Sequence, residues 1–249
     1  MAPASPASTP STCWKCNTPV TPMDVVCPSM HCRTIQPVRD VDFFRFLLGT
    51  DASPSFAVNQ QQLRKRYLEL QQRCHPDSWS ALPPAKGAVS EQDQLKEDEM
   101  GKKEVKEQRL MEKQFAEARS SWLNKAYHTL RDPLLRANYL LSMHGKNVVE
   151  EDKLHPDEND QDKAFLLEMM EIRERIDEAS DVQELESLAQ ANQDRIRSHV
   201  EGMTLVFEEL LKRFDQPDVA LLDEAKKLTV QLKYLYNIDQ ACRESASTK

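Results

Sequence analysis

Four closely spaced cysteines are the residues best suited to chemistry in this chain. They occur in the stretch CWKCNTPVTPMDVVCPSMHC as two pairs, Cys13 with Cys16 and Cys27 with Cys32. Two such pairs can supply four thiolates to one ion, and a zinc ion bound in this way orders a segment too small to fold alone. The second pair has the wider spacing C-x-x-x-x-C, which leaves His31 as an alternative to Cys32. We predict a Zn²⁺ site here; the alternative is a disordered segment without metal.

The distribution of all six cysteines fits a metal site in a reducing compartment better than a disulfide framework. Four are grouped, whereas Cys74 and Cys242 stand alone. Four thiolate ligands leave a zinc ion no open position, and no neighbouring Glu or His suggests a general base. We therefore expect the site to be structural and not catalytic.

A His-Pro-Asp string, formed by His75, Pro76 and Asp77, follows a basic run of helical character, QQQLRKRYLELQQRC. Because a proline disfavours helical geometry in the residue before it, the helix should end at His75. The imidazole and the Asp77 carboxylate would then lie on a stiff, exposed loop. A second copy of the string, at 155–157, lies among acidic residues with no basic helix before it, and we interpret that copy as linker.

The helix before His75 is expected to have one buried face and one basic face. Leu63, Tyr67 and Leu70 recur at helical spacing, which predicts contact with a core. The charged residues of this run are four cations and a single acidic residue, Glu69. The cations are Arg64, Lys65, Arg66 and Arg73. Such a face suits an acidic partner surface.

The composition predicts an all-α protein. Hydrophobic residues make up 39% of the 249 residues, enough for cores of ordinary size, and the chain has only 5 glycines. No G-x-x-x-x-G-K or G-x-G-x-x-G motif is present, so we expect no nucleotide site. The net charge of −8 opposes non-specific binding to nucleic acid, and no apolar stretch reaches membrane-spanning length.

Local signals place the elements of the first half of the chain. The run VDFFRFLLG predicts a short helix stopped by Gly49, and Phe56 in the next connector is expected to anchor in a core. Residues 78–105 are rich in Pro, Ala, Gln, Glu and Lys, so we expect a long, mobile loop there. A helix is predicted over 106–130, ending before an Asp-Pro pair.

After an acidic linker at 146–163, one helix carries more apolar surface than a single packing face requires. Its core stripe is formed by Phe165, Met169, Ile172 and Ile176. Five further residues project onto a different arc of the helix: Leu166, Leu167, Met170, Glu171 and Glu174. These residues either add buried packing or form an exposed apolar patch bordered by carboxylates, and patches of that kind mark binding sites.

Two more helical runs follow, the second from Val219 to about Cys242 after Pro217, and Tyr234 projects away from the core stripe of that last helix. Short connections between antiparallel helices predict a three-helix bundle over 164–245. Residues 150–184 contain 14 Asp or Glu and 4 Lys or Arg. The basic helix and the acidic bundle therefore favour two different partners.

The stretch WLNKAYHTLRDPLLRANYLLSMHG, from Trp122 to Gly145, resembles the corresponding part of the HscB family of iron–sulfur cluster co-chaperones. The basic helix followed by His-Pro-Asp likewise resembles the J-domain, which stimulates ATP hydrolysis by DnaK-type chaperones. Together with cysteine pairs found in animal-type members, the resemblance covers residues 13 to about 240. It implies a tail at 1–12, a zinc segment at 13–36, a J-domain at 40–145, the linker and the bundle.

The resemblance also implies roles for individual residues. Contacts with the chaperone are expected from His75, Pro76, Asp77, Arg64, Lys65 and Arg66. Contacts with an IscU-type scaffold, on which iron–sulfur clusters are assembled, are expected from Leu166, Leu167, Met170, Glu171, Glu174 and Tyr234. The protein itself would perform no catalysis. It would couple the scaffold to the ATPase cycle of the chaperone.

Two other classes of function remain open from the sequence. A general J-domain co-chaperone would hold unfolded clients in a broad apolar groove, and a zinc-dependent nucleic-acid binder would use the cysteine segment, although the acidic bundle opposes this. The family implies the mitochondrial matrix, yet the first residues, MAPASPASTPST, lack arginine and do not resemble a presequence, so the cytoplasm is the alternative. The last helix could also pair with a second copy.

Overall fold

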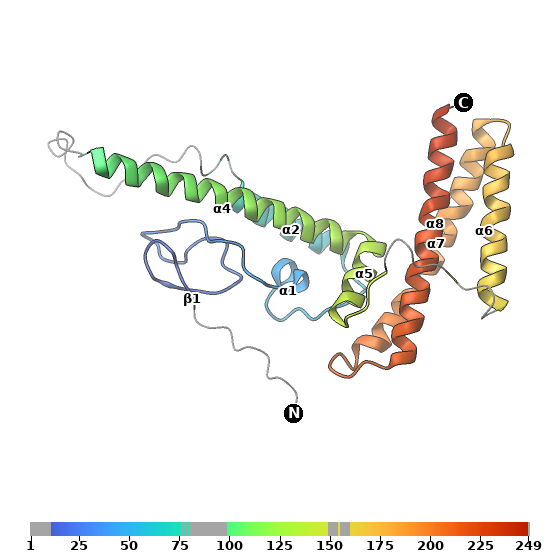
Figure 1. The fold of residues 1–249 in the computed structure, drawn as a ribbon, viewed down its shortest axis with the longest axis horizontal. Coiled ribbons are helices and arrows are strands. Elements are labelled where there is room, and N and C mark those ends of the chain that lie inside the picture. The colour runs from blue at the N-terminus through green and yellow to red at the C-terminus, as the bar shows by residue number, and fades with distance from the viewer. Residues whose placement is uncertain are drawn as a thin grey trace. The chain divides into compact units, whose positions relative to one another are not determined.

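The computed structural model describes residues 11–75, 77, 79, 99–148, 154 and 160–248, with the backbone alone for 99–104 and 248. These residues form seven helices and two short strands, which confirms the predicted all-α class (Figure 1). The chain divides into two compact units. Unit 1 comprises Met1–Ser53 and Asn59–His128, and unit 2 comprises Pro54–Val58 and Thr129–Lys249.

Unit 1 begins with a small antiparallel pair of strands, β1 (Ser11–Thr12) and β2 (Pro19–Val20). The Ser11 hydroxyl donates a hydrogen bond of 2.8 Å to the Val20 carbonyl. Ser11 and Thr12 are therefore part of the cysteine segment, which corrects the prediction that the tail extends over 1–12. Residues 1–10 lie outside the described residues.

Two local signals set the bounds of helix α1 (Phe43–Leu48). The Asp42 side chain accepts a hydrogen bond from the Arg45 N–H at its N-terminus, and Gly49 follows its last residue with a φ of 119°. Such a φ strains any residue with a side chain. The predicted stop at Gly49 is confirmed.

Helix α2 (Gln60–Cys74) carries the predicted basic run. Its Asn59 N-cap accepts hydrogen bonds from the Gln61 and Gln62 N–H groups, and the helix ends at His75 as predicted. Leu63 and Leu70 are buried. Tyr67 donates a hydrogen bond of 2.9 Å to Asn124 in the helix described next, so α2 is held to it by a polar contact as well as by packing.

Helix α4 (Glu99–Arg131) begins earlier than the predicted start at residue 106. The predicted loop at 78–105 is therefore too long at its C-terminal end, because Glu, Met and Lys in EMGKKEV are good helix formers that continue the pattern backwards. Residues 78 and 80–98 of that loop are outside the described part, and Trp79 between them is helical, so the predicted loop also begins too early. The helix stops before Asp132, whose side chain caps α5 (Pro133–Met143) with Pro133 in the first turn.

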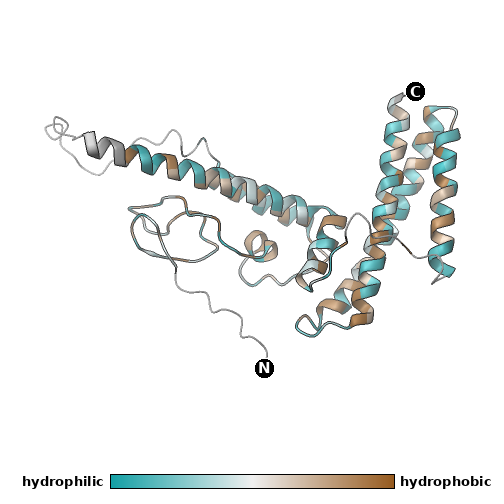
Figure 2. Ribbon diagram, in the orientation of Figure 1, coloured by the Kyte–Doolittle hydropathy of each residue, from teal (hydrophilic) through white to brown (hydrophobic). Residues whose placement is uncertain are grey.

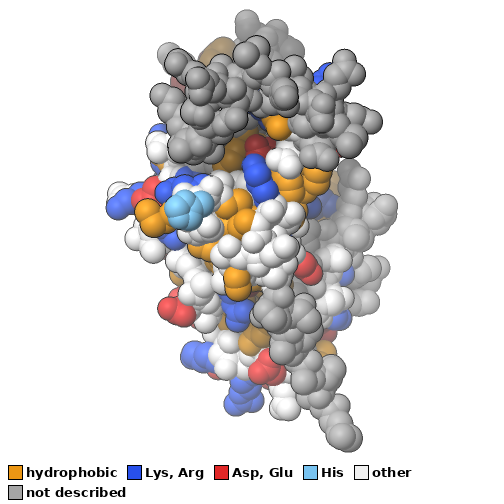
Figure 3. Space-filling view, turned by 90° about the vertical axis from the view of Figure 1, so that its left-hand side faces the viewer, with side chains coloured by type: hydrophobic (Ala, Val, Ile, Leu, Met, Phe, Trp, Pro, Cys, Tyr) orange, Lys and Arg blue, Asp and Glu red, His pale blue; other side chains and the backbone are white. Residues whose placement is uncertain are grey.

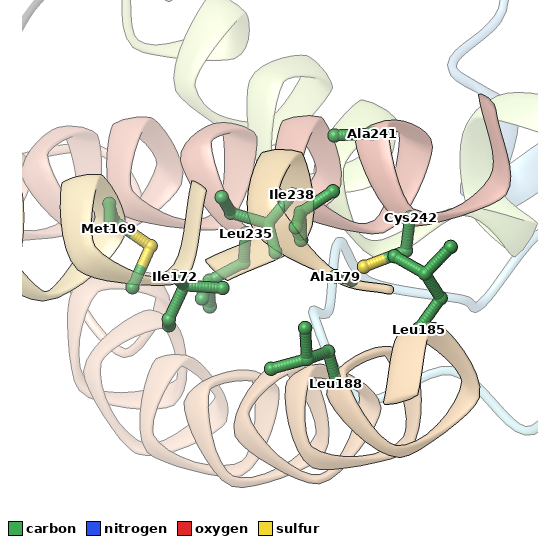
Figure 4. Packing of buried hydrophobic residues seen from close by; sticks show 10 residues of the cluster. Met169, Ile172, Ala179, Leu185, Leu188, Leu235, Ile238, Ala241 and Cys242 are labelled. Carbon is green, nitrogen blue, oxygen red and sulfur yellow. The ribbon is translucent and has the colours of Figure 1, made fainter. Parts of the chain in front are cut away.

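Unit 2 contains the predicted antiparallel three-helix bundle, formed by α6 (Asp160–Glu178), α7 (Val182–Leu211) and α8 (Val219–Thr248) (Figure 1). Apolar and polar positions alternate in patches along each helix, as expected where one face is buried (Figure 2). Side chains from all three helices meet in one core (Figure 4). This core comprises Met169, Ile172, Ile176, Ala179, Leu185, Leu188, Leu235, Ile238, Ala241 and Cys242.

The boundary between the two units differs from the predicted one. The predicted J-domain range, 40–145, is divided because α5 packs against α8 and belongs to unit 2. The connector residue Phe56 also belongs to unit 2, where its ring stacks on Phe207 of α7 at 4.8 Å and lies beneath the buried guanidinium of Arg136. Phe56 is thus an anchor as predicted, but in the C-terminal unit.

The predicted acidic linker at 146–163 is mostly outside the described residues, including the second His-Pro-Asp string. Its first residues are fixed, since the Asn138 amide exchanges two hydrogen bonds with the Val148 backbone. Its last residues, from Asp160, already belong to α6. Among the described helices, none is long and apolar enough to cross a membrane.

Candidate functional site

The structure brings the four predicted cysteines together. Their Sγ atoms all lie within 4.8 Å of one another, with 3.8 Å between Cys13 and Cys32 and 3.5 Å between Cys16 and Cys27. In a tetrahedral Zn–S4 site with bonds of about 2.3 Å, neighbouring sulfur atoms are about 3.8 Å apart. The cluster therefore fits a metal ion, with Cys32 and not the exposed His31 completing the set.

Two tight turns hold the cysteines in place. In the first, the Asn17 N–H donates to the Cys13 carbonyl at 3.0 Å, and Asn17 adopts a φ of 58°. In the second, the Cys32 and Arg33 N–H groups both donate to the Ser29 carbonyl at 3.1 Å. The second pair, which has the longer spacing, thus lies on a wider turn. The sulfur atoms of both pairs still lie close together.

The thiols of the cluster have different acidities. Hydrogen bonds from the Thr18 side chain and backbone lower the pKa of Cys16 to about 6, whereas burial raises the pKa of Cys32 to about 12. Burial alone would raise the pKa of Cys13, but N–H donors, among them Lys15 and Gln36, lower it overall. The environment thus already stabilises two of the four thiolates that a metal ion requires.

The cysteine segment packs against α4. Trp14 contacts Phe115 edge to face at 5.6 Å between ring centroids, and Lys15 forms an ion pair of 3.2 Å with Glu112. Arg119, buried on the same helix, donates hydrogen bonds to carbonyls of the segment. Burial lowers its pKa to about 10, so the guanidinium stays charged at neutral pH. Arg119 was not predicted from the sequence, although its place on the apolar face between Phe115 and Trp122 was a signal.

The predicted chaperone-binding residues lie at the C-terminal end of α2 and along its surface. His75 is half-exposed and Asp77 is 89% exposed, and their side chains approach each other at 3.6 Å. The Asp77 N–H donates to His75 Nδ1 at 3.3 Å, which orients the imidazole. Pro76 lies outside the described residues. Trp79, absent from the predicted set, donates to the Arg73 carbonyl at 3.3 Å and so caps the end of the helix.

The basic face of α2 is accessible. Arg64 and Lys65 are exposed, and Arg66 is half-buried in an ion pair of 3.0 Å with Glu69. Leu68 is exposed beside these charges. Arg73, nearer the end of the helix, is exposed too, so α2 offers a partner three cations without an ion pair among the described contacts, together with an apolar side chain.

A groove between α6 and α8 collects three of the six predicted scaffold-binding residues. Leu166, Met170 and Tyr234 line it, and its volume is 320 Å³. The groove is also lined by four residues that the sequence analysis did not select: Met169, Arg173, Asn237 and Ile238. These lie one helical turn from the predicted ones, which is the signal that could have found them. Met169 and Ile238 point into the core beneath the groove (Figure 4).

The other three predicted residues lie beside the groove on the outer arc of α6. Leu167 is 51% exposed and Met170, at the edge of the groove, is 60% exposed. Glu171 and Glu174 are exposed as well. The exposure of Leu167 and Met170 excludes the interpretation that they add buried packing. The structure has the alternative, an exposed apolar surface bordered by carboxylates.

A second groove, of 440 Å³, lies on the other side of α6 toward α7. It is partly closed by an ion pair of 2.9 Å between Arg195 and Glu168. His199 in its wall is half-buried, and its Nε2 lies 2.8 Å from the Leu228 carbonyl. This contact gives one imidazole nitrogen of His199 a hydrogen-bonding partner within the bundle.

Three features define this chain as a co-chaperone of the J-domain type. They are the cysteine cluster, the basic helix followed by an exposed histidine and aspartate, and the three-helix bundle. A family model described as "HSCB C-terminal oligomerisation domain" matches residues 161–243. The iron-sulfur cluster co-chaperone protein HscB of Homo sapiens is 30% identical over 92% of this chain and 79% of its own length. The J-type co-chaperone JAC1, mitochondrial, of Saccharomyces cerevisiae is 28% identical over 79% of this chain and 83% of its own.

Solved structures agree with the sequence relatives. The crystal structure of human co-chaperone protein HscB matches with a TM-score of 0.65 at 26% identity, covering 94% of this chain and 98% of that one. The Jac1 co-chaperone of Saccharomyces cerevisiae shares the fold with a TM-score of 0.51 at 24% identity, over 83% of this chain and 95% of that one. The chain belongs to the HscB family.

Proposed function

We propose that this protein is an adaptor of iron–sulfur cluster biogenesis that presents an assembly scaffold to a chaperone. Its C-terminal bundle binds an IscU-type scaffold, and its J-domain stimulates the ATPase of a dedicated DnaK-type chaperone, which promotes cluster transfer. The observation that carries the proposal is the exposed apolar surface on α6, bordered by Glu171 and Glu174, in a chain of the HscB family. The protein needs no nucleotide site for this role.

The J-domain acts by differential contact. His75 and Asp77, held beside each other at the end of α2, bind the hydrolysis-competent arrangement of the chaperone better than the resting one. This preference shifts the equilibrium and accelerates ATP hydrolysis in the partner. The exposed cations Arg64 and Lys65, with Arg66, steer the encounter and fix its orientation. Pro76, whose ring fixes its own φ, would restrict the backbone between the two contact residues.

The bundle holds the scaffold through a small number of anchors. Leu166, Leu167, Met170 and Tyr234 supply apolar area, and exposed side chains of this size can dominate an interface. The glutamates then select a basic scaffold surface over an acidic one. Binding scaffold and chaperone with one molecule raises the effective concentration of the scaffold at the chaperone.

The four cysteines hold a structural zinc ion, whose role is to fix the segment that packs on α4. The names of the human and yeast relatives, one of them mitochondrial, support the mitochondrial matrix as the compartment. The cytoplasm is the alternative. The description of the matching family model as an oligomerisation domain supports a homodimer as a further state of the bundle.

Single-turnover ATP hydrolysis by a cognate DnaK-type chaperone tests the proposal, with this protein and an iron–sulfur scaffold added separately and together. Each should stimulate less alone than both do together. His75→Gln should abolish stimulation while scaffold binding is retained, because the histidine lies in unit 1 and the scaffold surface in unit 2. A folded variant that loses both functions would refute this division of labour.

The two other classes of function make different demands. With a general J-domain co-chaperone, unfolded peptides should increase ATP hydrolysis by the chaperone, and addition of the scaffold should have no effect. A nucleic-acid binder needs a continuous basic surface, but on the described part of the face in Figure 3, Lys and Arg side chains are interrupted by hydrophobic and acidic ones. Salt-sensitive binding to a duplex would be the sign in favour of that class.

A further inference from the structure

A buried arginine joins the cysteine segment to the helices of unit 1. Arg119 of α4 is only 1% exposed. Its Nε donates to the Gln36 carbonyl at 3.0 Å, and one terminal nitrogen donates to the carbonyls of Asp24 and Pro37 at 3.1 and 2.8 Å. A planar guanidinium can satisfy three carbonyls from two parts of a loop at once, which a lysine ammonium on its flexible stem does less well.

Gln36 connects this arginine to the cysteine cluster. Its side chain is fully buried, and its Nε2 donates to Cys13 Sγ at 3.2 Å. The carbonyl of the same residue accepts the hydrogen bond from Arg119. One residue therefore contacts a sulfur of the cluster with its side chain and α4 with its backbone.

On the other side, Arg119 contacts the helices that form the J-domain. Its guanidinium lies 5.8 Å from the centre of the Phe46 ring of α1, and α1 packs against α2. This chain of contacts thus begins at a candidate metal ligand and reaches the helix pair of the J-domain.

We propose that Gln36 and Arg119 are positioning residues that couple metal binding by the four cysteines to the stability of α4 and the helices packed on it. The inference rests on the proposed metal site. Gln36 orients and stabilises the Cys13 thiolate for the ion, as hydrogen bonds to metal ligands commonly do. Arg119 transmits the resulting order of residues 24–37 to α4. The cysteine segment is then a metal-dependent brace of the J-domain.

The first test measures Zn²⁺ affinity by competition with a chromophoric chelator, using the full-length reduced chain. Gln36→Met has a similar volume and removes the N–H donor to Cys13. The variant should bind Zn²⁺ about 10- to 100-fold more weakly, the usual cost of losing such a partner. An affinity equal to that of the native chain would overturn the role of Gln36.

The second test follows amide hydrogen exchange in α4 with and without Zn²⁺. In the native chain Zn²⁺ should slow exchange around Arg119, because the ordered segment holds that part of the helix. Arg119→Lys should still take up Zn²⁺ through its cysteines but lose this slowing. The matched control is Arg109→Lys, an exposed arginine of the same helix, which should behave as the native chain does.

The outcomes separate the two proposals. A native chain that does not bind Zn²⁺ would refute the metal site and the coupling with it. A native chain that binds Zn²⁺, combined with equal slowing in Arg119→Lys and in the control, would refute the coupling alone.

Discussion

At the scale of single residues, the apolar side chains on the outer arc of α6 do little for the fold. Leu167 and Met170 are 51% and 60% exposed, whereas Met169 and Ile172 beside them are buried in the core of the bundle. Burial of apolar area stabilises a folded chain. A side chain that stays exposed therefore contributes only a small part of the free energy that full burial would give. Residues of this kind are more useful to a partner than to their own domain.

The first prediction follows from this exposure. Simultaneous replacement of Leu166, Leu167 and Met170 by alanine should weaken scaffold binding by at least about 2 kcal/mol, because anchor residues carry most of an interface. Titration calorimetry with the scaffold measures the loss. Leu205→Ala, on the exposed surface of α7 at 70% exposure, is the control that should bind normally. Normal binding by the triple variant would move the scaffold surface elsewhere.

A second prediction at this scale concerns the half-buried His199. Burial holds the pKa of His199 below its ordinary value, although the Leu228 carbonyl opposes the shift. As pH falls below the pKa that the histidine has in the unfolded chain, the unfolded chain therefore binds a proton that the folded chain does not. Acidification thus favours the unfolded chain and lowers the stability of the fold. The free energy of unfolding should drop below about pH 6.5, at no more than about 1.4 kcal/mol per pH unit for one proton. Denaturant titrations at several pH values should show a shallower drop in His199→Gln.

At the scale of elements, the start of α5 depends on one side chain. Asp132 accepts a hydrogen bond of 2.9 Å from the Leu135 N–H as the N-cap of α5, and Tyr236 of α8 interacts with the same carboxyl group. Burial raises the pKa of Tyr236 to about 12, so its hydroxyl stays protonated. The cap thus starts one helix and contacts another.

Asp132→Ala should therefore destabilise unit 2 by more than an isolated cap. Loss of a helix N-cap costs about 0.5 to 2 kcal/mol, and we expect the upper end of that range. Asp181→Ala removes the N-cap of α7. The Asp181 side chain accepts a hydrogen bond from the Glu184 N–H alone among its described contacts, so this change should cost less. Chemical denaturation of both variants gives the comparison; equal losses would show that the contact with Tyr236 adds nothing.

At the scale of the whole molecule, charge is distributed unevenly. Residues 150–184 hold 14 acidic and 4 basic residues, whereas α2 carries four cations against Glu69. A surface with one sign of charge accelerates encounter with a complementary partner and rejects a partner of like charge. We therefore expect the two surfaces of this protein to discriminate between partners before any close contact forms.

Scaffold binding should accordingly weaken as salt is raised, because exposed charges are screened beyond about 10 Å at 0.1 M ionic strength. The double variant Glu171→Gln, Glu174→Gln should bind more weakly at low salt and show a smaller salt dependence. Glu186→Gln, an exposed change on α7, serves as the control. Association rates measured across a salt series decide the matter, and an unchanged salt slope in the double variant would remove these glutamates from the interface.

The amino-acid sequence by itself determined where most elements begin and end. Gly49 follows the end of α1, α2 ends at His75 as the proline after it in the sequence predicts, and Asp132 with Pro133 separates α4 from α5. Each of these signals acts on the backbone within a few residues, so it can be read without knowledge of the rest of the chain. The helical periods of the core stripe and the spacing of the cysteines are local in the same sense.

Only the tertiary structure decided what those elements pack against. Phe56 and α5 join the C-terminal unit, and Arg119 is buried beneath carbonyls that precede it by more than 80 residues. The groove formed by Leu166, Met170 and Tyr234 likewise requires two helices to meet. Such contacts depend on surfaces brought together by folding, and helical spacing along one segment carries no information about which distant segment will cover it.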